Sequence, residues 1–201
     1  SIFFEPYQVI THMFMHSLTD PFHIFFNMFL LIMFGSQLER LWGTKRFFIF
    51  YISCGLGAFL LYNSIGVWQI MELKKELISL GADINKINFE LSSLNPNMGY
   101  KQTILNDYAN MNRSTMVGAS GAIFGLLAGF AVLYPNTEMM LMFIPVPIKA
   151  KYLIGAYLLF EVYSSLTNPG DQVAHLAHVG GAIVGIILVL AWKRKDRQKT
   201  W

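Results

Sequence analysis

The sequence predicts an all-α membrane protein, a bundle of five membrane-spanning helices in one domain. Three observations support this fold class. Of the 201 residues, 54% are hydrophobic and only 13% are charged, whereas soluble domains carry about 25% charged residues. The apolar residues gather in five long runs. In two of these runs glycine recurs every four residues, a pattern typical of membrane helices that pack closely.

Each run is long enough to cross a bilayer, which requires about 17–25 mostly apolar residues. We expect spans at residues 22–41, 47–67, 118–134, 148–166 and 173–192. Residues 1–19 are mixed in character and are expected to form a loop with short helical pieces. Residues 68–116 form a polar insertion between the second and third spans. Apolar side chains at helical spacing in this insertion predict short amphipathic helices with a turn at 95–99: Ile70, Leu73, Leu77, Leu80, Ile84, Ile87, Leu91 and Leu94.

Basic residues predict the orientation of the spans, because Lys and Arg favour the cytoplasmic side. Ten of the 15 basic residues lie in the segments that connect or follow the spans at one end of the bundle. The other five lie in 68–116, where five acids match them. The C-terminus is therefore expected in the cytoplasm and the insertion on the extracytoplasmic side. The net charge of +3 fits anchoring to a membrane, and a nucleic-acid-binding surface is not expected.

Candidate catalytic residues lie where the spans begin on the extracytoplasmic side. The third run opens with Gly118-Ala119-Ser120-Gly121, and His178 lies near the start of the fifth. Polar and ionisable groups inside a membrane are costly and usually functional. The third run covers about 25 Å at 1.5 Å per residue, less than a hydrocarbon core of about 30 Å. Ser120 is therefore expected below the surface, at a helix N-terminus that opens into a cavity.

Spacing along the helices predicts how these groups meet. If the small-residue faces of spans three and five pack together, Ser120 and His178 lie at one level, within hydrogen-bonding distance, as serine activation requires. These faces consist of Gly121, Gly125 and Gly129 on one helix and Gly181 and Gly185 on the other. His23 and Asn27 are four residues apart on one helical face. Both side chains can donate hydrogen bonds to an oxyanion, as can the backbone N–H of Ser120.

The ordered set of motifs resembles that of the rhomboid intramembrane serine proteases, most closely the bacterial members. The resemblance rests on Gly118-Ala119-Ser120-Gly121, His23-xxx-Asn27 with His16 upstream, Leu38-Glu39-xx-Trp42-Gly43-xx-Arg46-Phe47, and Ala177-His178-Val179-Gly180-Gly181 followed by Gly185. It covers nearly all of the chain outside 68–116. The family core has six spans, so a first span is expected before Ser1.

The resemblance implies a Ser–His dyad without a third carboxylate. Ser120 would be the nucleophile, His178 the general base and acid, and His23 and Asn27 the oxyanion donors. Residues 167–172 would form a mobile cap over the site. Family members cleave transmembrane helices near their outer end. The implied partners are transmembrane protein substrates and the lipid bilayer.

We therefore expect a multi-pass serine endopeptidase, without cofactor or metal, in a bacterial inner membrane, whose active site opens to the extracytoplasmic side. Two other functions stay open. His12 with His16 and His175 with His178 have spacings that suit metal ligands, but no carboxylate stands close to either pair in the sequence. A non-catalytic relative that binds transmembrane segments would be expected to lack Ser120 or His178. The natural substrate, the oligomeric state and the roles of the insertion and of Glu161 are not predicted.

Overall fold

The structure is a computed structural model that describes residues 5–15, 21–93, 102–113, 118–141, 144–167 and 175–198. His16, the turn at 95–99 and the cap after Thr167 lie outside the described residues. The chain divides into two compact units. One is a helical membrane bundle built from residues 7–62 and from 116 onward, and it contains every candidate site residue that the structure describes. The other is built mainly from residues 63–115.

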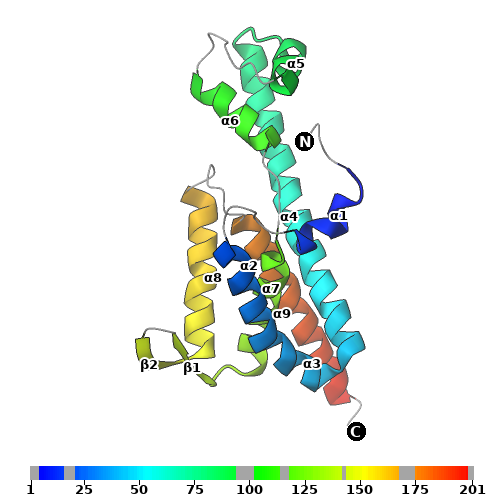
Figure 1. The fold of residues 1–201 in the computed structure, drawn as a ribbon, viewed down its shortest axis with the longest axis vertical. Helices are drawn as coiled ribbons and strands as arrows, with labels where there is room; N and C mark the ends of the chain where they lie inside the picture. Colours follow the sequence, from blue (N-terminus) through cyan, green and yellow to red (C-terminus); the bar gives the residue numbers. More distant parts are fainter. Residues whose placement is uncertain are drawn as a thin grey trace. The chain divides into compact units, whose positions relative to one another are not determined.

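Helices dominate the bundle, in keeping with the predicted fold class (Figure 1). Its elements are α1 (Gln8–Thr11), the 3-10 turn η1 (His12–Phe14), α2 (Pro21–Leu30), the π-helical stretch η2 (Leu31–Gly35), α3 (Ser36–Trp42), the first part of α4 (Thr44–Ser79), α7 (Ser120–Leu133), β1 (Glu138–Leu141), β2 (Ile144–Lys149), α8 (Ala150–Thr167) and α9 (His175–Gln198). The stretch from α2 to α3 is one continuous span, Pro21–Trp42. Gly43, with φ +76°, ends it, because a left-handed residue after a helix is accommodated best by glycine.

Helix α7 lies at the centre of the bundle. Every residue from 121 to 130 is buried, as expected for a helix that is apolar on all sides. It packs most extensively on α9, and also on α8 and η2. At 14 residues the helix is about 21 Å long, so it is too short to cross a hydrocarbon core of about 30 Å.

The close packing of α7 on α9 is confirmed as the sequence predicted. A Cβ added to Gly181 would overlap the carbonyl oxygen of Gly121. One turn further along, a Cβ on Gly185 would stand 2.5 Å from the carbonyl oxygen of Gly125. The two backbones therefore touch directly, which only glycine allows. This contact lies immediately after Ser120 in one helix and three residues after His178 in the other, so it sets the distance between them.

Three described stretches are long and apolar enough to cross a membrane: Pro21–Trp42, Thr44–Ser79 and His175–Asp196. Helix α8 has 18 residues but is not among them, and Lys151 and Glu161 both lower its hydropathy. The 36 residues of α4 span about 54 Å, more than a hydrocarbon core requires. Its charged last third must therefore lie outside that core.

The unit formed mainly by residues 63–115 differs from the prediction in two ways. Helix α4 continues to Ser79 rather than ending near residue 67, so Ile70, Leu73 and Leu77 belong to its last turns. Helix α5 (Ile84–Ser93) was expected, but α6 (Gln102–Arg113) was not, because its sequence is mostly polar. These helices share a small apolar core formed by Leu77, Ala82, Ile84, Ile87, Leu105, Tyr108 and Ala109.

A two-stranded antiparallel sheet, which the sequence did not predict, precedes α8. Strands β1 and β2 pair Glu138 with Lys149 and Met139 with Ile148. The fourth helix therefore begins at Ala150 rather than at Ile148. Two prolines, Pro145 and Pro147, explain the strand, because proline interrupts the interior of a helix.

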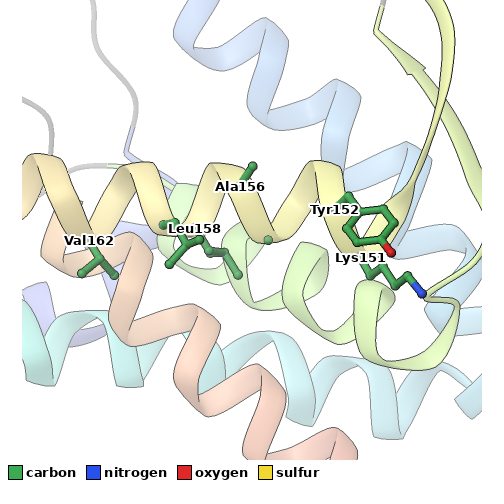
Figure 2. Close-up of a pocket in the computed structure, with 7 residues that line it drawn as sticks. Lys151, Tyr152, Ala156, Leu158 and Val162 are labelled. Atoms are coloured by element: carbon green, nitrogen blue, oxygen red, sulfur yellow. The ribbon is translucent and has the colours of Figure 1, made fainter.

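An open apolar hollow runs along one face of α8 (Figure 2). Lys151 and Tyr152 lie at one end of it and Val162 at the other, with Leu158 between them. Its lining contains none of the candidate catalytic residues. The hollow is therefore separate from the site described below.

Candidate active site

Ser120 and His178 lie next to each other, although 58 residues separate them in the sequence. The Nε2 atom of His178 is 2.9 Å from the hydroxyl oxygen of Ser120. Ser120 is the first residue of α7, and His178 lies in the first turn of α9. The imidazole is buried and the serine half-buried. This is the contact that a general base needs to take a proton from a serine nucleophile.

A turn centred on Gly118 delivers Ser120 to this position. Gly118 has φ +115°, a backbone conformation that side chains with a Cβ rarely adopt. Its N–H donates a hydrogen bond to the carbonyl oxygen of His12, at 2.9 Å. A Cβ on Gly118 would stand only 3.0 Å from the ring of His23. Glycine is therefore required here both by the backbone and by the neighbouring imidazole.

His23 of α2 faces the same region. The point where a Cβ of Gly118 would stand is 3.0 Å from Nε2 of His23 and 3.7 Å from the hydroxyl oxygen of Ser120. Asn27 lies one helical turn further along and is 5% exposed. Among the described residues its amide nitrogen Nδ2 has no hydrogen-bond partner. A buried donor without a partner is costly, so this nitrogen is suited to a ligand that arrives with an acceptor.

Phe124 fixes the plane of the His178 ring. Its own ring stacks on the imidazole with centroids 4.1 Å apart and an interplanar angle of 10°. Phe124 is four residues after Ser120, so both side chains project from the same face of α7. Ser120 and the aromatic ring that supports the His178 imidazole therefore come from successive turns of one helix.

Glu161 of α8 contacts the other nitrogen of His178. Its Oε2 accepts a hydrogen bond from Nδ1 of His178 at 2.8 Å and one from Nδ1 of His175 at 2.6 Å. The side chain is 2% exposed. Sequence analysis did not predict this contact, although a signal was present. Ala150, Ile154, Glu161 and Ser164 form the buried stripe of α8, and an acid on that stripe needs a partner inside the bundle.

The cluster of Glu161 and the two histidines also has a spacing that would suit a metal ion. Ligand atoms of Glu161, His175 and His178 all lie within 4.8 Å of one another. In the alternative in which His12 and His16 bind a metal, His16 lies outside the described residues.

His12 lies beside the site but directs its ring elsewhere. The Nδ1 nitrogen lies 2.9 Å from the carbonyl oxygen of Gln8 and must therefore carry the proton. The ring approaches that of Phe59, with centroids 5.4 Å apart. Burial lowers the pKa of His12, against the opposing effect of the backbone hydrogen bond, so the ring is neutral near pH 7. Its contribution to the site is the carbonyl oxygen that holds Gly118.

Comparison with known proteins identifies the family to which this chain belongs. The chain matches the family model of the Rhomboid domain over residues 4–82 and 97–195. It therefore belongs to the rhomboid family of membrane proteins. No solved structure matches the chain.

Two curated relatives are similar to parts of the chain. An uncharacterized mitochondrial rhomboid protein of Schizosaccharomyces pombe is 36% identical over 88 residues, which is 40% of this chain and 22% of that protein. The mitochondrial RHOMBOID-like protein 12 of Arabidopsis thaliana is 26% identical over 189 residues, which is 94% of this chain and 46% of that protein. The chain thus spans less than half the length of either relative. Both relatives are named as mitochondrial proteins, so they give no support to the expected location in a bacterial inner membrane.

Proposed function

We propose that this protein is an intramembrane serine endopeptidase that cleaves transmembrane helices of other membrane proteins. The observation that carries the proposal is the 2.9 Å contact between Nε2 of His178 and the hydroxyl oxygen of Ser120. Membership of the rhomboid family supports it. A non-catalytic family member would have no need for a serine and an imidazole in this relation.

Acylation begins when the hydroxyl oxygen of Ser120 attacks the carbonyl carbon of the scissile peptide bond. His178 takes the hydroxyl proton on Nε2 and returns it to the amine as the C–N bond breaks. Water then attacks the acyl-enzyme, again giving a proton to His178, and the ester bond to Ser120 breaks. The proton on His178 returns to the serine oxygen, so the enzyme ends each cycle unchanged.

The negative charge on the carbonyl oxygen needs hydrogen-bond donors during this sequence. Nε2 of His23, Nδ2 of Asn27 and the backbone N–H of Ser120 are the donors that we assign. The N–H groups in the first turn of α7 have no acceptor within the helix, and the partial positive charge there favours an anion. The lack of a partner for Asn27 Nδ2 among the described residues supports this role.

The short length of α7 supports chemistry below the membrane surface. If the inner end of α7 lies at the inner boundary of the hydrocarbon core, Ser120 stands roughly 9 Å below the outer boundary. A substrate helix must unwind locally to present a peptide bond there, because its peptide groups are hydrogen-bonded within the helix. The distribution of basic residues favours a cytoplasmic C-terminus and a site that opens to the extracytoplasmic side.

Replacement of Ser120 by alanine tests the proposal. The wild-type chain and Ser120→Ala are reconstituted in liposomes with a reporter transmembrane helix, and the cleavage products are quantified by mass spectrometry. We expect kcat to fall by roughly four to six orders of magnitude. The matched control is Ser165→Ala, because the Ser165 hydroxyl donates to the backbone of its own helix, at the carbonyl of Val162. Undiminished cleavage by Ser120→Ala would exclude the proposed mechanism.

A chelator arm in the same assay distinguishes serine from metal chemistry. Serine hydrolysis is expected to continue at the wild-type rate in excess chelator. Loss of activity in chelator, with recovery on adding Zn²⁺, would instead favour a metal at Glu161, His175 and His178.

Removal of the oxyanion donors is expected to slow the chemical step. Asn27→Ala and His23→Ala should each lower kcat by about 10²- to 10³-fold. KM should change little, because these donors act on charge that develops in the transition state. Asn136→Ala, at the opposite end of α7, is the control. A rise in KM with unchanged kcat would show that these side chains bind substrate rather than stabilise the oxyanion.

A further inference from the structure

Glu161 is the one buried acid in the described part of the bundle that contacts the proposed base. Its Oε2 accepts hydrogen bonds from Nδ1 of His178 and of His175, and its side chain is almost fully removed from solvent. A carboxylate in such a place is expensive unless partners satisfy it. The Nδ1 donors of His178 and His175 provide that compensation.

The contact with Glu161 determines which nitrogen of His178 carries the proton. A carboxylate can only accept hydrogen bonds, so Nδ1 of His178 must be the donor. In a neutral imidazole the other nitrogen, Nε2, then has a free lone pair. Nε2 is the atom 2.9 Å from the Ser120 hydroxyl. The ring is thus held in the tautomer that accepts the serine proton.

We propose that Glu161 is the positioning residue of a Ser120–His178–Glu161 triad. It fixes the tautomer and rotation of His178 and stabilises the imidazolium that forms when Ser120 loses its proton. This inference rests on the function proposed above, and it departs from the two-residue arrangement that the family resemblance implies. Glu161 itself touches neither the serine nor the scissile bond.

His175 also holds the carboxylate in place. It lies one helical turn before His178 on α9, and both rings donate to the same oxygen of Glu161. The two imidazoles are nearly perpendicular, at 89°, so they approach that oxygen from different directions. An oxygen held by two donors is restrained from moving away from His178 during the reaction.

The change that tests this role is Glu161→Gln, which keeps the shape and removes the charge. An amide presents one oxygen and one NH₂ group to two imidazoles that both donate. The amide oxygen can take the place of Oε2 and accept from both rings, but it carries no charge to stabilise the imidazolium. We expect kcat to fall by roughly 10²- to 10⁴-fold, with KM within about twofold of wild type. The matched control is Glu138→Gln, an identical change on the exposed strand β1.

Rescue by a conservative variant separates positioning from mere packing. Glu161→Asp keeps the carboxylate on a shorter stem and should recover at least about tenfold of the kcat lost in Glu161→Gln. Glu161→Ala, which leaves both imidazoles without this partner, should recover none. All rates are normalised to the folded fraction, measured by thermal unfolding in detergent.

The possible results distinguish this inference from the function on which it rests. If Ser120→Ala is inactive and Glu161→Gln keeps the wild-type kcat, the triad is excluded and the protease stands. The role is likewise excluded if Glu161→Gln and Glu161→Asp lose activity equally, or only in proportion to the unfolded fraction. If Ser120→Ala cleaves normally, the proposed function itself fails.

Discussion

Replacement of His178 by alanine is expected to lower kcat as far as replacement of Ser120 does, by roughly four to six orders of magnitude. Without the imidazole the Ser120 hydroxyl loses the nitrogen, 2.9 Å away, that takes its proton. The double variant Ser120→Ala/His178→Ala should be no slower than either single variant, because members of one catalytic unit act together. The measurement is cleavage of the reporter helix in liposomes under single-turnover conditions.

Non-additivity is the decisive part of this result. If the losses from the two single variants multiply in the double variant, the residues act independently and the 2.9 Å contact has no mechanistic meaning. Each variant must keep the elution volume and unfolding temperature of the wild type, so that the comparison concerns chemistry alone.

Replacement of Gly181 by alanine is expected to cause the largest loss of stability. The added methyl group would overlap the carbonyl oxygen of Gly121, and backbone atoms cannot move aside as a flexible side chain can. Overpacking of a core costs about 1–3 kcal/mol and occasionally more, and we expect about 3 kcal/mol or more here. The free energy of unfolding in detergent measures this loss. Activity should fall as well, because α9 must move away from α7 and carry His178 with it.

The matched control is Gly155→Ala on α8. A Cβ at this position meets no atom within 4 Å, so the same change adds no overlap. It should leave stability unchanged or raise it by up to about 1 kcal/mol, the difference in helix propensity between the two residues. Equal stability of Gly181→Ala and wild type would show that α7 and α9 do not touch at their glycines.

The features predicted well from the sequence depend on residues that lie close together in the chain. Glycines four residues apart predicted the contact between α7 and α9, and that contact set the level of Ser120 against His178. The place of Ser120 at a helix N-terminus followed from the short apolar run that begins at Gly118. These signals are strong because a membrane offers few alternatives to packed helices.

The features that were missed depend on contacts between segments distant in the sequence. Glu161 pairs with histidines 14 and 17 residues away, across a connection between two helices, and no local pattern states that pairing. Helix α6 has a polar sequence whose few apolar side chains become meaningful only beside Leu77 and Ile87. Helix α8 begins at Ala150 rather than at Ile148 because Ile148 and Lys149 pair with Met139 and Glu138 in the hairpin of β1 and β2.

The most direct test of the account is covalent labelling of Ser120 with a fluorophosphonate, a reagent that modifies only activated serines. We predict stoichiometric modification of Ser120 in the wild-type protein, located by peptide mass spectrometry. Proteolytic activity should fall in proportion to the labelled fraction. In His178→Ala the labelling rate should fall by several orders of magnitude. Proteolysis that persists in fully labelled protein, or a label on Ser120 that forms equally fast without His178, would contradict the account.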